Sequence, residues 1–457
     1  MAFWNDLCES IRGNCRECMT TPFTRKKALI IGGIVLVIII IIIIIAVAVN
    51  SANSGSSGQT TGTDIIKSNP LIIGNTRLSE IIKKTYQNKI NNLNLDDIMT
   101  KAKASTQDLI KGYVATQIWD VGASSCILSQ NHDAVSQTLE QIDLINRLFE
   151  ANKNFTIIKS SSDITEAKKN KKIGAVLRVD GGYALDAKLS MIRTYYNLGV
   201  RILALVGTCD NPWGASAWNT SDDADLDAFG KKIIEEMSRL GMIIDISGAS
   251  KKVQLSIIAE AKAANLPVLL SNSGLKLDPG SPNNVDKDVL TALKEKTGLV
   301  TLSLNKDQVC ATNALNCTMS DVIDHLDKLK GILGKEASKY IGLGGNFGSE
   351  KDNQYPVDLD NPTKFATLLD NLLKPQPTAT FKWNTNDLKL MVGENFIQLF
   401  ANVEKVAADL KTKKKPLEDL IDEGKLPKNV TVALSDKVKS AIIPICYTDF
   451  EERYPKK

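Results

Sequence analysis

The hydrophobic positions in the middle of the chain follow two alternating periods. Short apolar runs rich in β-branched residues recur at 69–74, 114–121, 173–179, 200–206, 242–246, 267–271, 299–304 and 340–344. Between these runs apolar residues repeat every three or four positions, as at Phe229, Ile233, Met237 and Leu240, which is the spacing of one helix face. Strands alternating with helices over short connections predict a parallel sheet covered by helices. Eight strands favour a (β/α)8 barrel in the α/β class, and an open doubly wound sheet is the alternative.

The N-terminus shows a different pattern. Residues 28–49 are uncharged and apolar, long enough to cross a bilayer as a helix and too long for the apolar part of a signal peptide. Lys and Arg precede this segment and do not recur until Lys67. The positive-inside rule therefore predicts a single-pass type II cell-membrane protein, with residues 1–27 in the cytosol and the C-terminal domain extracellular. Residues 50–65, rich in Gly, Ser and Thr, predict a flexible stalk, and 66–457 an ectodomain.

This topology places the cysteines and the glycosylation sequons in different compartments. Three cysteines fall on the cytosolic side near the membrane, where S-palmitoylation is expected: Cys8, Cys15 and Cys18. The others face an oxidising space: Cys126, Cys209, Cys310, Cys317 and Cys446. Their odd number leaves one for an intermolecular bond or a free thiol. The sequons all lie on the outer side as candidate glycosylation sites: Asn154, Asn219, Asn316 and Asn429.

Charge and histidine content limit the function classes. The formal net charge is only +4, so nothing in the total suggests nucleic acid as a partner. The chain has two histidines, His132 at a predicted helix start and His325 within a predicted helix, and both are interpreted as structural. Hydrolytic barrels place His, Asp, Glu or Lys where strands end. Here Asp180 is the one carboxylate among the strand-end positions that the pattern identifies.

Residues 341–349, IGLGGNFGS, have the glycine content of a phosphate-binding loop. Their spacing departs from G-x-G-x-x-G, and no helix follows in the position that a dinucleotide site requires. The segment is therefore interpreted as the end of a barrel strand rather than as a nucleotide site.

Several segments, in order along the chain, resemble the membrane dipeptidase (renal dipeptidase) family of zinc peptidases. They are TCDNPWGASA (208–217), FGKKIIEEMSRLGMIIDIS (229–247), PVLLSNS (267–273), VIDHLDKL (322–329), IGLGGNFG (341–348) and GENFIQLFANVE (393–404). The resemblance runs from about residue 66 to about residue 450, nearly the whole predicted ectodomain. It implies a (β/α)8 barrel that holds two zinc ions and hydrolyses dipeptides.

The metal-binding motifs of that family are altered in this chain. Asn75 and Arg77 stand where the family's DGHND motif has its His and Asp ligands. Asp180 replaces the bridging Glu of the EGGH motif. Gly248 and Asn272 replace the ligand histidines of the DLSH and FSHS motifs. By this resemblance most of the zinc ligands are absent.

The positions that act on substrate in the family are altered too. Tyr183 replaces the last His of EGGH, and Gly207 replaces the His of THxC that helps to hold substrate. Asn346 replaces the catalytic Asp of GxDFDG. Asn283 stands where the family's Arg for the substrate carboxylate is expected.

These substitutions predict a protein without zinc, other cofactor or catalytic residue. Amides bind Zn²⁺ weakly, and Arg77 puts a permanent positive charge where a dication would lie. A hard cation such as Ca²⁺ on Asp180, Asn272 and Asn346 is also disfavoured by Arg77, for which pairing with Asp180 is the simpler expectation. The leading hypothesis is a catalytically inactive cell-surface protein acting in binding, adhesion or as a receptor or scaffold, with an unidentified extracellular protein partner. The alternatives are an active zinc dipeptidase and a non-catalytic binder of amino acids or dipeptides.

The resemblance also assigns the outer cysteines. Cys126 and Cys209 match two positions that form an intradomain disulfide in the family. Cys310 matches half of a second bridge whose usual partner is missing, and nearby Cys317 is the proposed substitute. Cys446 resembles the cysteine that links two subunits. A disulfide-linked homodimer is therefore expected.

Overall fold

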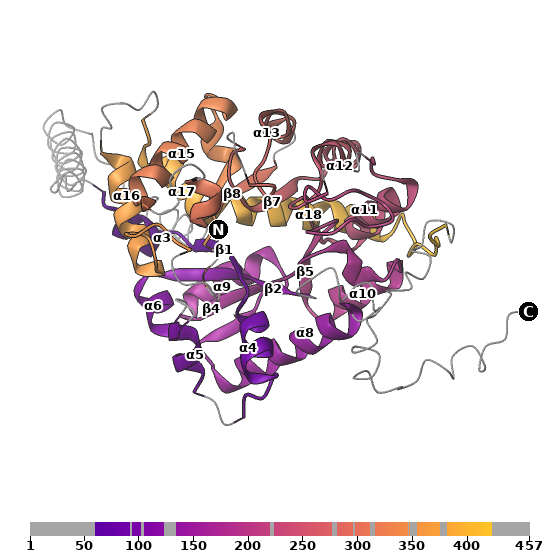
Figure 1. The fold of residues 1–457 in the computed structure, drawn as a ribbon, viewed down its shortest axis with the longest axis horizontal. Coiled ribbons are helices and arrows are strands. Elements are labelled where there is room, and N and C mark those ends of the chain that lie inside the picture. Colours follow the sequence, from indigo (N-terminus) through magenta and orange to yellow (C-terminus); the bar gives the residue numbers. More distant parts are fainter. Residues whose placement is uncertain are drawn as a thin grey trace, which may run out of the picture. The chain divides into compact units, whose positions relative to one another are not determined.

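Eight parallel strands close into a barrel in the computed structural model (Figure 1). They are β1 (Leu71–Thr76), β2 (Val114–Val121), β4 (Ile173–Val179), β5 (Val200–Ala204), β6 (Ile243–Asp245), β7 (Val268–Ser273), β8 (Leu299–Leu302) and β9 (Ile341–Leu343). The hydrogen-bonded order is β2-β1-β9-β8-β7-β6-β5-β4, and β2 pairs with β4 along its length, which closes the barrel. The predicted (β/α)8 barrel is confirmed, and the open doubly wound sheet is wrong because it would leave β2 and β4 unpaired.

The structure describes residues 60–91, 94–101, 105–122, 134–219, 224–276, 281–295, 298–310, 316–345, 347, 354–374 and 382–422. The predicted cytosolic tail, the predicted transmembrane helix and the stalk up to residue 59 lie outside these residues. Among the residues described, no helix combines the length and the apolar character needed to cross a bilayer.

A ninth strand, β3 (Phe155–Ile157), is not predicted by the sequence pattern. It pairs with the first residues of β4, starting at Phe155 opposite Ile173. β5 pairs with β4 only from Leu177 onward, so β3 extends the same edge without entering the barrel. A strand of three residues is too short for an alternating pattern to be recognised.

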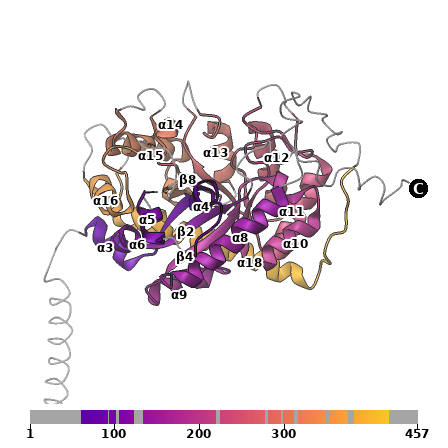
Figure 2. The ribbon, with the colours of Figure 1, turned by 60° about the horizontal axis from the view of Figure 1, so that its bottom comes forward.

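Helices cover the outside of the barrel, as Figure 2 shows around β2, β4 and β8. The α-helices that follow β1 are α4 (Leu78–Tyr86), α5 (Leu95–Lys101), α6 (Thr106–Lys111), α8 (Ala134–Ala151), α9 (Ser161–Lys169), α10 (Leu189–Asn197), α11 (Ala228–Leu240), α12 (Lys251–Ala263), α13 (Lys287–Lys294), α14 (Lys306–Val309), α15 (Met319–Leu333), α16 (Phe365–Leu373), α17 (Thr385–Lys389) and α18 (Asn395–Lys411). Short helical turns are η1 (Gly182–Leu185), η3 (Ala337–Tyr340), η4 (Pro362–Lys364) and the π-helical η5 (Leu390–Glu394).

The helices use the apolar positions that the sequence pattern identifies. In α11 the side chains of Phe229, Ile233 and Met237 are buried, because their spacing puts them on one face. Asp227 caps the first turn through its side chain, and Gly241 ends the helix in a left-handed conformation with φ of 85°. Glycine is suited to that position because it has no Cβ.

The folded unit begins earlier than composition suggests. It starts at Thr61, and helix α3 (Gly62–Ser68) includes residues 62–65, which the sequence assigns to the end of the stalk. Thr61 and Asp64 form a capping box, and the Gly62 amide donates to Asp370 on α16 at 2.6 Å. A Cβ at Gly62 would lie 2.2 Å from the Ala366 carbonyl oxygen. The glycine that resembles a linker residue therefore serves close helix packing.

His325 is a structural residue, as the sequence predicts. It lies in α15 with 1% of its surface exposed, and its Nε2 accepts the Leu275 N–H at 2.6 Å. Burial lowers its pKa to about 4, so the imidazole is neutral near pH 7. His132 lies outside the described residues.

We predict that acid destabilises the fold through His325. The unfolded chain binds a proton near the ordinary pKa of 6.5, whereas the folded chain resists protonation until about pH 4. Unfolding free energy should therefore fall between these values, by up to about 3 kcal/mol from this residue. Denaturant unfolding at several pH values measures this effect. The unfolding free energy of His325→Gln, whose amide oxygen can accept the Leu275 N–H, should fall less between these pH values than that of the unchanged protein. Identical pH profiles for the two proteins would contradict this assignment.

Candidate functional site

Charged side chains meet inside the barrel at the C-terminal ends of its strands. Asp120 lies near the end of β2, Arg178 near the end of β4, and Asp245 at the end of β6. Arg77 and Asp180 follow the ends of β1 and β4. These five residues are called the strand-end cluster below. The same end of a (β/α)8 barrel carries the binding and catalytic residues in enzymes with this fold.

Arg178 is the centre of the strand-end cluster. Its Nη1 donates to Asp120 Oδ1 and to Asp180 Oδ1, both at 2.8 Å, and its Nε donates to Asp245 Oδ2 at 2.6 Å. Only 3% of its side chain is exposed. Burial alone would lower the pKa of Arg178, but the three carboxylates raise it well above its ordinary value. The guanidinium therefore stays charged and links β2, β4 and β6.

Arg77 forms a second, more open ion pair. Its Nη2 donates to Asp180 Oδ2 at 2.7 Å, which confirms the expected pairing. Its other nitrogens lie 3.7 Å from Asp120 and 3.8 Å from Glu80, and 42% of the side chain is exposed. Burial raises the pKa of Asp180, but Arg178 and Arg77 together bring it below its ordinary value. Asp180 is thus ionised, with each oxygen bonded to a guanidinium.

The other two carboxylates differ in their surroundings. Burial and the neighbouring charge of Asp180 raise the pKa of Asp120 to about 6, against the effect of Arg178. Asp245 is fully buried and accepts hydrogen bonds from the hydroxyls of Ser247 and Ser271, at 2.6 Å and 2.5 Å. Asp245 is therefore held by hydrogen bonds in addition to Arg178.

Two asparagines occupy predicted site positions beside the strand-end cluster. Asn75 is buried, and its Nδ2 donates to Asp120 Oδ1 at 3.2 Å and to Ser271 at 3.3 Å. Asn272 has a left-handed backbone with φ of 53°, and its main-chain N–H donates to the Thr301 hydroxyl at 2.8 Å. Among the described residues, neither side-chain oxygen has a hydrogen-bond partner. Both side chains are neutral and contribute no charge to the site.

Two glycines replace predicted ligand or substrate positions and pack backbone against backbone. Gly207 and Gly248 have φ of 80° and 78°. A Cβ at Gly248 would lie 2.5 Å from the Gly207 carbonyl oxygen, and one at Gly207 would lie 2.8 Å from the Gly181 Cα. The hydroxyl of Ser216 donates to the carbonyls of both glycines. Any larger side chain at either position requires the backbone to move.

The remaining predicted site residues are not brought into the strand-end cluster as ligands. The Tyr183 hydroxyl donates to the Asp180 main-chain oxygen at 2.6 Å, and burial raises the pKa of this phenol. The Asn283 side-chain oxygen accepts the indole N–H of Trp218 at 3.2 Å. Asn346 lies outside the described residues.

These residues do not fit a two-zinc site. Zinc requires imidazole, thiolate or free carboxylate donors, whereas Asp120, Asp180 and Asp245 are already bonded to guanidinium groups at 2.6–2.8 Å. The positive charge of Arg178 between them opposes a dication at the same place. Asp180 is equally saturated with respect to a hard cation such as Ca²⁺.

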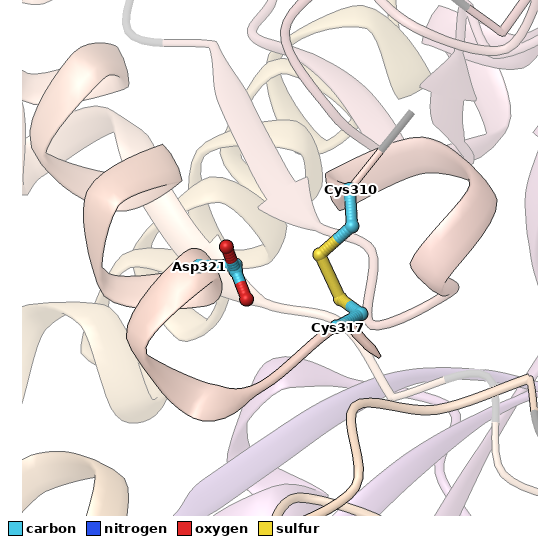
Figure 3. Close-up of side chains that lie close together, drawn as sticks. All are labelled: Cys310, Cys317 and Asp321. Carbon is cyan, nitrogen blue, oxygen red and sulfur yellow. A yellow bond between two sulfur atoms is a disulfide. The ribbon is translucent and has the colours of Figure 1, made fainter. Parts of the chain in front are cut away.

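One group of potential metal ligands stands apart from this site. Within the described ranges, the one trio of His, Cys, Asp or Glu ligand atoms is formed by Cys310, Cys317 and Asp321 (Figure 3). The two sulfurs are bonded to each other, with a Cα–Cα distance of 5.8 Å. A disulfide offers no thiolate, so this trio is not a metal site. The Cys310–Cys317 bond is a structural cross-link, and it is the pairing that the sequence analysis suggested.

The other cysteines and sequons are only partly described. Cys209 is disulfide-bonded. Asn154 and Asn316 are exposed, and Asn219 is half-buried. The remaining predicted positions lie outside the described residues: Cys8, Cys15, Cys18, Cys126, Asn429 and Cys446.

Sequence reasoning missed three members of the strand-end cluster. Asp120, Arg178 and Asp245 are single charges inside the apolar runs VATQIWDV, IGAVLRV and MIIDI. Strands of a parallel barrel are buried on both faces, and a buried charge requires an opposite partner. Charged residues within such runs were therefore a usable signal for a buried ion cluster.

We predict that Arg178→Met lowers the unfolding free energy by about 3–5 kcal/mol, because it leaves buried carboxylates without compensation. Arg147→Met is the matched control, since Arg147 forms an ion pair with Asp143 on the surface of α8 and should cost less than about 1 kcal/mol. Chemical denaturation of both variants measures the difference. Equal effects would show that the strand-end cluster does not depend on Arg178.

The chain matches known proteins over most of the barrel. Residues 63–414 match a family model described as Membrane dipeptidase (Peptidase family M19). Human Dipeptidase 3 is 30% identical over 367 residues, which cover 79% of this chain and 70% of the relative. Rat Dipeptidase 3 is 31% identical over 342 residues, which cover 74% of this chain and 66% of the relative.

Solved structures share the fold at lower identity. An amidohydrolase from Pseudomonas aeruginosa superposes with a TM-score of 0.61 at 18% identity, covering 75% of this chain and 99% of that chain. A metallo peptidase from Rhodobacter sphaeroides was solved with a phosphinate mimic of the dipeptide L-Ala-D-Ala. It superposes with a TM-score of 0.58 at 16% identity, covering 73% of this chain and 99% of that chain. These structures show the shared fold, and the family match and the curated relatives show that the chain belongs to the membrane dipeptidase family.

Proposed function

We propose that this protein is a catalytically inactive member of the membrane dipeptidase family that acts at the cell surface in binding, adhesion or as a receptor or scaffold. The observation that supports the proposal best is the guanidinium of Arg178, bonded at 2.6–2.8 Å to Asp120, Asp180 and Asp245. It supplies a fixed positive charge at the strand ends of the barrel.

Peptide hydrolysis needs an activated nucleophile, and in zinc peptidases the metal supplies it by lowering the pKa of a bound water. The described residues of this site offer no replacement. Asp180 is a weak base because Arg178 and Arg77 lower its pKa. The Tyr183 hydroxyl is already donating to a main-chain oxygen, and its raised pKa keeps it protonated. The pKa of Asp120 is raised to about 6, but its Oδ1 accepts hydrogen bonds from Arg178 at 2.8 Å and from Asn75 at 3.2 Å. None of these three groups is therefore a free base that could remove a proton from water near pH 7.

The site also gives little support to a non-catalytic binder of amino acids or dipeptides. Arg77 is the exposed cation that would face a ligand carboxylate, but Asp180 already occupies its guanidinium at 2.7 Å. Asp120 and Glu80 lie within 4 Å of the same group and would repel an incoming anion. We therefore favour a role that uses the outer surface of the barrel over one that uses its mouth.

We further propose a type II orientation in the cell membrane, with residues 28–49 as the anchor, and a homodimer linked through Cys446. Both proposals rest on the sequence pattern and the resemblance. Cys446→Ser should convert a dimer band to a monomer band on a non-reducing gel, whereas Cys209→Ser should leave the dimer. An unchanged dimer in Cys446→Ser would contradict the assignment of this cysteine.

We predict no zinc-dependent hydrolysis of L-Ala-D-Ala by the purified protein, because the strand-end carboxylates are bonded to guanidinium groups and are not free to bind zinc or to act as a base. The Rhodobacter sphaeroides metallo peptidase, assayed with the same added Zn²⁺, is the positive control. Release of free alanine is the measurement. Turnover that a chelator abolishes would establish the alternative, an active zinc dipeptidase.

A further inference from the structure

A cavity of about 280 Å³ lies apart from the strand-end cluster, between the loops that follow β5, β6 and β7. Its lining includes Ser216 and Asn219 after β5, Gln254 on α12, and Lys276 before α13. It is slightly smaller than pockets for drug-sized ligands, which have on the order of 300–1,000 Å³. The volume suits a single sugar ring.

The cavity is polar but carries balanced charge. Lys251 pairs with Asp288 at 2.6 Å, and Lys276 lies 3.7 Å from Asp286. Gln254 is 7% exposed, and its amide nitrogen donates to the Ile246 carbonyl. In the described part of the chain, no hydrogen bond engages its side-chain oxygen. A neutral ligand with hydroxyl and amide groups fits this lining better than an ion does.

Asn219 connects this cavity to a modification motif. It begins the sequon Asn-Thr-Ser at 219–221, and its side chain both lines the cavity and donates to Asp210. An N-glycosidic bond replaces one of the two amide hydrogens, so the other can keep the bond to Asp210. The neighbouring Trp218 is 51% exposed and is fixed by its hydrogen bond to Asn283. Its ring offers an apolar face beside the attachment point.

We propose that the first sugar of an N-linked glycan on Asn219 sits in this cavity. The glycan then covers part of the barrel face at which the strands end, where family members act on substrate. The inference rests on the proposed extracellular placement of the domain, because N-glycosylation belongs to secreted and cell-surface chains. It adds to the proposed function a steric block to large substrates at the barrel mouth.

The full-length chain, produced in cultured mammalian cells, allows a direct test with a second sequon as internal control. Asn154 is exposed and lies just before β3 and β4, at the opposite end of the strands. Native protein is treated with peptide N-glycosidase, and glycan loss at each site is followed by peptide mass spectrometry. Both sites should be occupied, with removal at Asn219 about tenfold slower than at Asn154 until the protein is unfolded. Ala217→Trp, which fills the cavity, should make removal at Asn219 as fast as at Asn154.

The possible results separate this inference from the topology on which it rests. An unmodified Asn219 beside a modified Asn154 overturns the inference alone, as does equal removal from both sites of the native protein. Undiminished protection in Ala217→Trp also overturns it, because the cavity is then not what shields the sugar. If neither sequon carries a glycan, the inference and the extracellular placement both fail.

Discussion

The contact between the Arg178 guanidinium and three carboxylates organises the interior of this barrel. Asp120 and Asp245 lie in β2 and β6, and Asp180 directly follows β4. Mutual repulsion would drive the three carboxylates apart without a positive charge between them. In a zinc peptidase a dication can neutralise such carboxylates. Here an arginine does so permanently, since its pKa lies far above physiological pH. The ion pairs of Arg178 therefore hold the ends of β2, β4 and β6 together.

The backbone at two of the predicted site positions leaves no room for a larger side chain. Gly207 and Gly248 are in contact through their main chains, and a Cβ at Gly248 would lie 2.5 Å from the Gly207 oxygen. A histidine in place of Gly248 would therefore require the loop to rearrange. Ser216 ties the two loops together by donating to both carbonyls. These contacts fix the two loops in an arrangement that leaves no room for a side chain at Gly248.

Much of the fold could be predicted from the sequence, because the barrel strands and their covering helices carry clear periodic patterns. β3 and α3 could not, since a three-residue strand has no period and Gly62 resembles a linker while packing against α16. At the site, the sequence predicted the pairing of Arg77 with Asp180, which the structure shows. Sequence reasoning overlooked Arg178 because the partners of this residue come from β2 and β6, and only the strand register brings them within 3 Å.

Elemental analysis of the purified protein, after incubation with Zn²⁺ and removal of free metal, decides whether guanidinium groups have taken the place of the metal. If Arg178 and Arg77 hold the carboxylates as the structure shows, zinc will be close to zero per chain. A content of about two zinc ions per chain, typical of a two-metal hydrolase, would mean that the strand-end cluster opens to bind metal and that this protein is a metallopeptidase.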